Sequence, residues 1–507
     1  MLHNKIVILF VVCLGLPLFA ESLDSRDALY QQMEKLLSEV SPEATVSFVL
    51  RDVQTGKILF EKNGNKYVIP ASTLKLVTSW VALDKLGPDK RLETRLGYSG
   101  KISENILLGN LIITGGADPS FCSNQFGKEY TSDRIFSSWL AHLKKIGIDS
   151  VQGCVIGDGT LYKGFSPNPY ILWEDVGNYY SAVTSGLCFS DNRYSLFFKG
   201  HVKPGIPITL LSTSPEFIGI SHFENHLVTG PSSGGDSVYI YGSFLSRQRA
   251  LYGWYGAGKE KFSVKGALPF PSWTCAMEFR KYLKLHNISF GGNSAGACAQ
   301  YSTTPGPYPF LPENNSSITP LTSHQSPPLR DLIKHINYTS DNGYTEQLLA
   351  LLAIQAGQKG GYRDGIIVIE DYLKNISPVL ETVRIKDGCG LSRLNWISGE
   401  QITLLLAYAA QHPNFPDFRS TLLSPIKEGR GGGRFEPYYH QFKNLKVKLL
   451  AKTGSMSGVQ ALAGFLKTEK GKELSFFYVW NNTQEPSSSF HKSCSNLLRL
   501  ANDNSIF

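Results

Sequence analysis

The chain has 507 residues, of which 18% are charged and 42% hydrophobic, a balance typical of a globular protein with one to three domains. Its net charge of +8 is not concentrated in a long basic run, so the composition argues against nucleic-acid binding and is compatible with an anionic cell-wall surface. The 48 glycines and 26 prolines indicate many turns.

The N-terminus has the pattern of an export signal. Lys5 lies in a short polar start, and Ile6–Leu18 is almost wholly apolar. This stretch is too short for an ordinary membrane span, so we expect a signal peptide over residues 1–20 with cleavage after Ala20. An uncleaved anchor is the alternative. No later segment is apolar enough to span a bilayer, so membrane association is expected to be peripheral at most.

The cysteines and histidines do not form a metal-binding pattern. The spacing of the cysteines is irregular and contains no C-x-x-C, and the 11 histidines show no ligand spacing. We therefore expect neither a metal nor a cofactor. Export permits disulfides, so one or two bridges are expected, without an assignment. The cysteines are Cys13, Cys122, Cys154, Cys188, Cys275, Cys298, Cys389 and Cys494, and an odd number remains after signal removal.

The first part of the mature chain predicts a helix, a hairpin and a second helix. Apolar residues at helical spacing predict a helix within residues 23–45. Residues 45–50 alternate like a strand, and residues 58–60 follow a turn as the hairpin partner. Pro70 and the apolar positions after it predict a buried helix over residues 71–83.

From about residue 92 to residue 304 the pattern changes to short apolar runs broken by Gly, Pro, Asn and Ser. We interpret this stretch as a β-rich insertion of one or two domains, with helices at 133–146 and 272–283. A Pro-rich connector follows over residues 305–328. The remainder predicts helices and then strands, at 329–336, 344–356, 366–376, 447–451, 461–466 and 474–480, with a closing helix at 488–501.

Ser72 and Lys75 lie three positions apart near the start of the predicted helix, so they share a helix face. A serine hydroxyl becomes a good nucleophile when a neighbouring base takes its proton, and a buried lysine can be that base. The helix N-terminus adds N–H groups where an oxyanion would form. Alone, the S-x-x-K pattern also occurs by chance on many helices.

A second motif, Ser340-Asp341-Asn342, lies between two predicted helices. Ser340 could relay a proton between Lys75 and a leaving amine. The Asn342 amide could hold a substrate carbonyl and also contact Lys75.

A third motif, Lys452-Thr453-Gly454-Ser455, ends a predicted strand. Lys452 would supply a second cation that attracts a carboxylate, and Thr453 and Ser455 would supply hydroxyls for it. Gly454 removes a side chain where a substrate would lie against the strand. The Ser455 N–H could complete an oxyanion hole with that of Ser72.

The order S-x-x-K, S-x-N and K-T-G is typical of acyl-serine enzymes that act on penicillin or on D-Ala-D-Ala. This hypothesis requires all three motifs to meet in one cleft. One alternative is a catalytically weak protein that binds cell wall or senses penicillin, against which the intact motif set argues. Another is a β-lactamase, which the long insertion and the missing deacylating-base motif disfavour.

With these motifs the chain resembles the class C low-molecular-mass penicillin-binding proteins, the D-alanyl-D-alanine carboxypeptidase/endopeptidase family. The resemblance covers nearly everything after the signal. Further segments that fit it are Thr114–Pro119, Trp173-Glu174-Asp175, Asp387–Arg393 and Leu462–Phe465.

The resemblance implies an α/β fold: a transpeptidase/β-lactamase-like domain, with an antiparallel sheet flanked by helices, from residues 21–91 and 305–507. Two β-rich domains over residues 92–304 are inserted between the S-x-x-K and S-x-N motifs. It also implies a periplasmic serine DD-peptidase that cleaves peptidoglycan stem peptides and is acylated by β-lactams on Ser72. The balance of carboxypeptidase and endopeptidase activity and formation of a homo-oligomer are left open.

Family members that recognise a free diaminopimelate end use an acid from the insertion and an arginine after the D-G-x-G-L-S segment. By motif these residues match Asp175 and Arg393, and an aromatic residue matches Tyr180. Arginine suits a carboxylate and aspartate suits an ammonium group. The sequence departs from the family pattern at Cys389, where Ser is usual, and at Ser457, where some members have Gln. Both departures concern side-chain specificity.

Three other motifs are interpreted as structural. Ser190-Asp191-Asn192 repeats the S-D-N letters inside the insertion, where we expect a surface turn. Gly292–Gly296 spells G-x-S-x-G, but no helix is predicted directly after it. Gly429–Gly433 lacks the Lys-Ser/Thr of a phosphate loop, and a flexible loop is expected there.

Overall fold

The computed structural model describes residues 16–162, 168–216, 219–244, 246–291, 297–300, 317–424 and 448–503. The chain divides into two compact units. The first contains residues 1–70, 397–412 and 423–507, and the second contains residues 71–396 and 413–422. The predicted domain boundaries divide the chain differently and stay predictions.

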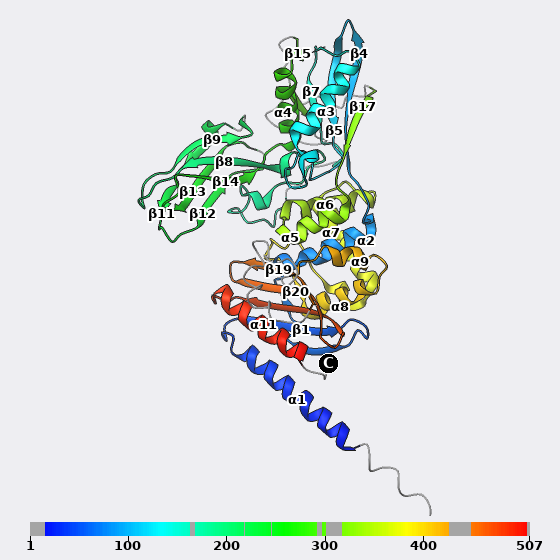
Figure 1. Ribbon diagram of the computed structural model, residues 1–507, viewed down its shortest axis with the longest axis vertical. Helices are drawn as coiled ribbons and strands as arrows, with labels where there is room; N and C mark the ends of the chain where they lie inside the picture. Colours follow the sequence, from blue (N-terminus) through cyan, green and yellow to red (C-terminus); the bar gives the residue numbers. More distant parts are fainter. Residues whose placement is uncertain are drawn as a thin grey trace, which may run out of the picture. The chain divides into compact units, whose positions relative to one another are not determined.

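The first unit is built on a five-stranded antiparallel sheet in the order β19-β20-β21-β1-β2. Figure 1 shows the blue N-terminal strands beside the orange C-terminal strands, so the two ends of the chain form one sheet. Its elements are α1 (Leu16–Ser38), β1 (Thr45–Asp52), β2 (Ile58–Lys62), β3 (Tyr67–Val68), β18 (Ile397–Ser398), α8 (Gly399–Ala410), β19 (Lys448–Met456), β20 (Val459–Lys467), β21 (Glu473–Asn481) and α11 (Ser487–Asp503).

Helices cover both faces of this sheet. Alternate residues of a strand point to opposite faces. On one face Ser475 donates its hydroxyl to the Thr403 carbonyl of α8, at 2.9 Å. On the other, Tyr478 stacks on Phe490 of α11, with ring centroids 5.0 Å apart. Because helices cover both faces, β1 and β21 are buried along almost their whole length.

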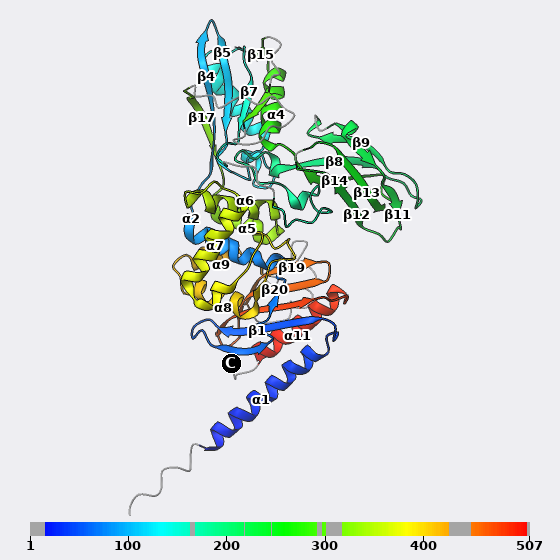
Figure 2. The ribbon, with the colours of Figure 1, turned by 180° about the vertical axis from the view of Figure 1, so that it is seen from behind.

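Helices of the second unit pack around α2, which is buried along most of its length. Trp80 of α2 meets Phe418 of α9 edge to face, with centroids 5.4 Å apart. Figure 2 shows blue α2 among the yellow-green helices from much later in the chain. These elements are η1 (Ala71–Leu74), α2 (Lys75–Leu86), α5 (Leu329–Thr339), α6 (Asn342–Gln355), α7 (Tyr362–Ile376) and α9 (Phe415–Ser420).

The rest of the second unit is rich in strands. A seven-stranded sheet contains β4–β7 and β15–β17, and two smaller sheets contain β8, β9 and β14, and β10–β13. The elements are β4 (Glu93–Ser103), β5 (Ile106–Thr114), α3 (Ser132–Lys145), β6 (Ser150–Val151), β7 (Val155–Asp158), β8 (Arg193–Lys199), β9 (Thr209–Ser214), β10 (Phe223–Asn225), β11 (Val228–Gly230), β12 (Asp236–Tyr241), β13 (Arg249–Gly256), β14 (Lys261–Ala267), α4 (Pro271–Leu285), β15 (Ser289–Phe290), β16 (Ala297–Gln300) and β17 (Thr319–Gln325).

The α/β class and most periodic elements agree with the prediction, with two local differences. One of the short apolar runs of the β-rich insertion, residues 151–156, is divided between the separate strands β6 and β7. The interruption contains Gly153, where a Cβ would lie 2.4 Å from the Gly109 carbonyl oxygen of the neighbouring strand. The helices α8 and α9 were not predicted.

The expected disulfides are wrong for the cysteines whose side chains are described: Cys122, Cys154, Cys188, Cys275, Cys389 and Cys494 are free. Five of these six thiols are buried, each within packed structure. Residues 1–15, the connector residues 305–316, Gly292–Gly296 and Gly429–Gly433 lie outside the described residues. Within the described ranges, no helix is both long enough and apolar enough to cross a membrane.

Candidate active site

Ser72 lies in a single 3-10 turn, η1, directly before α2. The preceding Ala71 has a left-handed φ of 47°, which is costly for a residue with a side chain. Gly390 packs against this turn: a Cβ there would lie 1.9 Å from the Ala71 carbonyl oxygen. The turn that presents Ser72 therefore depends on a glycine more than 300 positions later in the chain.

Lys75, the first residue of α2, is completely buried. Its Nζ donates to Ser72 Oγ at 3.0 Å, to Asn342 Oδ1 at 2.7 Å and to the Cys389 carbonyl oxygen at 2.7 Å. A buried amine requires such partners, because an unpaired charge or donor in the interior is costly. The predicted contacts of Lys75 with Ser72 and Asn342 are thus present in the structure.

Ser340 and Asp341 form the connection between α5 and α6. Ser340 ends α5 in a left-handed conformation, with φ 59° and ψ 39°. Asp341 then caps α6, since its Oδ1 accepts the Tyr344 N–H at 3.2 Å. Asn342 is the first residue of α6, so the cap fixes the position from which its side chain reaches Lys75.

The segment 387–392 is held against α2 and α6 by side chains on both helices. Thr78 donates its hydroxyl to the Gly388 carbonyl at 2.7 Å. Glu346 Oε1 accepts the N–H groups of Gly388 and Cys389, each at 2.8 Å. Asp387 accepts the N–H groups of two residues further along the same segment. These bonds place the Cys389 carbonyl at Lys75.

The carboxyl of Glu346 is protonated at neutral pH. Burial, together with the neighbouring Asp387 carboxylate, raises the pKa of Glu346 to about 8. Burial also raises the pKa of Asp387. Ligand atoms of Glu346, Asp387 and Cys389 all lie within 4.8 Å of one another, the one such group of potential metal ligands among the described residues. Because both carboxyls already accept amide N–H groups, we assign this cluster to holding the segment.

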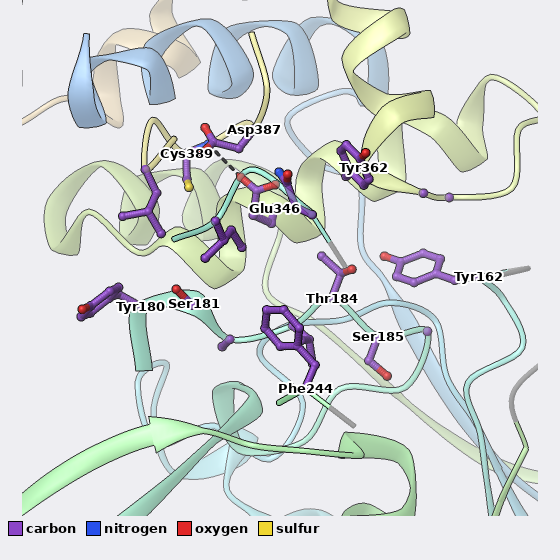
Figure 3. Close-up of a pocket in the computed structure, with 18 of the residues that line it drawn as sticks. Tyr162, Tyr180, Ser181, Thr184, Ser185, Phe244, Glu346, Tyr362, Asp387 and Cys389 are labelled. Atoms are coloured by element: carbon purple, nitrogen blue, oxygen red, sulfur yellow. Dashed lines mark hydrogen bonds between the residues drawn. The ribbon is translucent and has the colours of Figure 1, made fainter. Parts of the chain in front are cut away.

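A pocket lies beside this segment, wholly within the second unit. Figure 3 shows Glu346, Asp387 and Cys389 along one wall and Ser181, Thr184 and Phe244 opposite them. The wall opposite comes from the β-rich part of the unit. The pocket therefore lies between the insertion on one side and α6 with the segment 387–391 on the other.

Asp175 and Tyr180 form a pair near this pocket, with the Tyr180 hydroxyl donating to Asp175 Oδ1 at 3.0 Å. Burial raises the pKa of Asp175, and the positive charge of Arg393 opposes that rise. Burial and the Asp175 carboxylate raise the pKa of the Tyr180 hydroxyl, which therefore keeps its proton. Asp175 is therefore hydrogen-bonded to the Tyr180 phenol, and the positive charge of Arg393 also acts on its carboxyl.

The Lys452-Thr453-Gly454-Ser455 motif belongs to the first unit, on β19 at an edge of the five-stranded sheet. Lys452 is 1% exposed, and its Nζ donates to the Thr453 carbonyl at 2.8 Å. Gly454 pairs with Ala461 and Ser455 with Gln460 on β20. The predicted strand context of this motif is therefore correct.

The prediction of a surface turn at Ser190-Asp191-Asn192 is right about the turn and wrong about its exposure. Asn192 is 5% exposed, and Asp191 Oδ1 accepts the Tyr344 hydroxyl at 2.7 Å. The next residue, Arg193, forms an ion pair with Asp341 at 2.7 Å. The letters were interpreted from local turn chemistry, which carries no information about a partner some 150 positions away.

Sequence reasoning also missed the roles of Thr78, Glu346 and Asp387. One signal was available: Glu346 lies four positions after Asn342 and therefore faces the same side of α6. A backbone acceptor such as the Cys389 carbonyl has no signature in the sequence.

The chain was then compared with known proteins. Residues 29–499 match the model of the D-Ala-D-Ala carboxypeptidase 3 (S13) family. The chain is 24% identical over 456 residues to D-alanyl-D-alanine carboxypeptidase DacB of Haemophilus influenzae, covering 88% of this chain and 87% of that protein. It is 23% identical to the D-alanyl-D-alanine carboxypeptidase of Actinomadura sp. strain R39, covering 93% and 84%.

The fold matches a solved structure over nearly its whole length. Penicillin binding protein 4 (dacB) from Haemophilus influenzae superposes with a TM-score of 0.74 at 20% identity, covering 93% of this chain and 99% of that one. The same protein complexed with a β-lactam gives a TM-score of 0.69. The predicted transpeptidase-like fold is thereby confirmed.

Replacing Gly390 with alanine is expected to lower the rate of labelling by fluorescent penicillin at least tenfold, because the new Cβ would displace the Ala71–Ser72 turn. Gly357→Ala is the matched control. Gly357 also has a positive φ, of 76°, but open space around its missing Cβ. Equal labelling of the two variants would contradict the dependence of the Ser72 turn on Gly390.

Glu346→Gln is expected to remove a pH dependence of stability. The folded pKa of about 8 lies above the ordinary value of 4.5, so the folded state keeps a proton that the unfolded state loses. The free energy of unfolding of the natural protein should therefore fall as the pH rises from 4.5 towards 8, relative to the variant. Denaturant unfolding at pH 5 and pH 8 measures this, and parallel pH curves for the two proteins would contradict it.

Proposed function

Because the chain belongs to the D-Ala-D-Ala carboxypeptidase 3 (S13) family, it is a serine-type D-alanyl-D-alanine carboxypeptidase, and we propose that Ser72 is its nucleophile. The observation that supports this most directly is the position of Lys75. Its buried Nζ lies 3.0 Å from Ser72 Oγ, within reach of the proton that must leave.

In this proposal the reaction begins with Lys75 as an uncharged amine, whose two N–H groups donate to Asn342 Oδ1 and to the Cys389 carbonyl and whose lone pair accepts the Ser72 hydroxyl. It takes the Ser72 hydroxyl proton while Oγ attacks the carbonyl carbon between two D-alanines. Collapse of the tetrahedral intermediate breaks the C–N bond, and the proton passes from Lys75 through Ser340 to the leaving amine. Water then hydrolyses the acyl-Ser72 ester. The same steps would cleave a D-centred crosslink, in which the leaving amine belongs to a neighbouring stem peptide.

Asn342 has two roles in this proposal. Its Oδ1 accepts from Lys75 at 2.7 Å and thereby orients the amine, and its amide nitrogen remains to hold a peptide carbonyl of the substrate. The Cys389 carbonyl gives Lys75 a further fixed acceptor. Lys75 is thus aimed at Ser72 before substrate arrives, which reduces the reorganisation needed in the reaction.

Lys452, Thr453, Gly454 and Ser455 are proposed to bind the same substrate. Lys452 would attract the terminal carboxylate, and Thr453 and Ser455 would donate hydroxyls to it. The Ser455 N–H would stabilise the oxyanion. The position of β19 at the edge of its sheet supports this role, because an edge strand has backbone groups available to an extended peptide.

Asp175, Tyr180 and Arg393 are proposed to bind a zwitterionic stem-peptide side chain. Arg393 would bind its carboxylate, and Asp175, oriented by Tyr180, would bind its ammonium group. The burial-raised pKa of Asp175 supports this role, because a carboxylate short of partners gains most from a bound cation.

Peptidoglycan is the substrate and β-lactams are covalent inhibitors. The solved β-lactam complex of the related penicillin binding protein 4 supports acylation at the equivalent serine here. We place the protein outside the cytoplasm, where peptidoglycan is accessible, in agreement with the predicted signal over residues 1–20.

Ser72→Ala is expected to abolish covalent labelling by fluorescent penicillin, because no other hydroxyl replaces the nucleophile. Ser79→Ala is the control, since Ser79 lies on the same helix, is completely buried and has no catalytic role in the proposal. Labelled Ser72→Ala would refute the assignment. An unlabelled natural protein would instead favour the wall-binding alternative.

Arg393→Ala is expected to lower turnover of diaminopimelyl peptides at least tenfold while changing the rate of penicillin acylation less than threefold, because penicillin lacks the zwitterionic end. Arg384→Ala is the control, since the Arg384 guanidinium donates to the nearby Glu381 and Val383 carbonyls. Equal losses for peptide and penicillin would contradict a side-chain pocket at Arg393.

A further inference from the structure

Arg193, in the β-rich part of the second unit, forms a two-pronged ion pair with the aspartate between Ser340 and Asn342. Arg193 donates to both carboxylate oxygens of Asp341, at 2.7 and 2.8 Å. We propose that Arg193 is a positioning residue for acylation, which holds the Ser340–Asn342 connection in its working geometry. This inference rests on the proposed roles of Ser340 and Asn342.

Asp341 needs this partner because its side chain is only 3% exposed. Burial alone would raise the pKa of the Asp341 carboxyl, but Arg193 and His335 hold that pKa well below its usual range. His335 lies farther away, at 3.5 Å from Oδ2. Arg193 is therefore the main counter-charge, and its removal would leave a buried carboxylate poorly paired.

The ionised Asp341 in turn fixes the chain on both sides of it. Its carboxylate accepts the Tyr344 N–H, and its carbonyl accepts the Thr345 hydroxyl at 2.6 Å. Before it, Ser340 is held in a left-handed conformation, which is strained for a non-glycine residue. Such a conformation persists only where the surrounding structure imposes it, and Asp341, the next residue, is held by Arg193, His335 and the start of α6.

Arg193 itself is fixed by its surroundings. Its Nε donates to the Tyr179 carbonyl at 3.2 Å, and its guanidinium lies over the Tyr179 ring, 5.4 Å from the centroid. Just before it, Asp191 accepts the Tyr344 hydroxyl, a second bond to α6. The same turn therefore contacts α6 twice.

The effect reaches Lys75 through one residue. Asn342 follows Asp341 directly, and its Oδ1 lies 2.7 Å from Lys75 Nζ. A shift of the connection on loss of the ion pair would move both the acceptor of Lys75 and the proposed relay hydroxyl of Ser340. The insertion thus has a part in the chemistry through Arg193, in addition to forming a wall of the pocket.

The first test compares acylation rates. Arg193→Ala should lower the second-order rate of acylation by fluorescent penicillin 10- to 100-fold. Arg193→Lys keeps the positive charge but loses the planar guanidinium, so its acylation rate should lie between those of Arg193→Ala and the natural protein. Arg330→Ala is the matched control. Arg330 also forms ion pairs with aspartates, Asp89 and Asp417, but it lies at the surface of α5. This variant should stay within twofold of the natural rate.

A second measurement separates positioning from mere stability. In a double-mutant cycle with Asn342→Ala, the two effects should be strongly non-additive, because both act on Lys75 through one connection. Adding Asp341→Asn to Arg193→Ala should restore part of the lost rate, because the unpaired charge disappears. Melting temperatures of all variants are measured alongside.

The inference is overturned if Arg193→Ala is acylated at the natural rate, or if its loss is additive with that of Asn342→Ala. It is also overturned if Arg193→Ala loses thermal stability while the folded fraction reacts normally. These outcomes differ from failure of the proposed function, which would appear as labelled Ser72→Ala or as an unlabelled natural protein.

Discussion

The structure of the candidate site depends on one buried amine. Lys75 Nζ has acceptors on three separate segments: Ser72 in the turn before α2, Asn342 on α6 and the carbonyl of Cys389. Removing an amine from water is unfavourable unless such acceptors are fixed in advance. Each of the three segments must therefore be held in place by other contacts, and much of the second unit serves that purpose.

Those supporting contacts are themselves buried polar groups. Glu346 keeps its proton and accepts two N–H groups of the segment 387–392, while Asp387 accepts further N–H groups within it. Asp341 stays ionised, because Arg193 and His335 face it. Glu346 is neutral because another acid, Asp387, is its neighbour. Asp341 is charged because the cation Arg193 is its neighbour. The site thus combines two ways of making a buried carboxyl tolerable.

The sequence predicts regular local elements but not contacts between residues far apart in the chain. Periodicity located α3, α4, α6 and the strands β19–β21, because each buries a regular face. It missed α9, whose six residues begin with Phe-Pro and are too short for a periodic pattern. The motif letters singled out Ser72, Lys75 and Asn342, and in the structure the Lys75 side chain hydrogen-bonds to the other two. Three other contacts have no local sequence pattern. The Cys389 contact uses a backbone carbonyl, and Arg193 reaches Asp341 from the distant insertion. The Gly390 contact depends on the absence of a side chain.

The two S-D-N triplets show why letters alone do not assign a role. Both contain serines in the left-handed region, with φ of 49° at Ser190 and 59° at Ser340. Beyond the serine the two backbones differ, because Asp191 and Asn192 also have positive φ, whereas Asp341 is extended with φ −67° and Asn342 begins α6. The triplets also differ in what the asparagine meets: Asn192 donates to the Val183 carbonyl, whereas Asn342 accepts from Lys75. The first triplet supports the second through Asp191 and Arg193. A motif therefore becomes catalytic through its long-range partner, and here the structural copy helps to hold the proposed catalytic one.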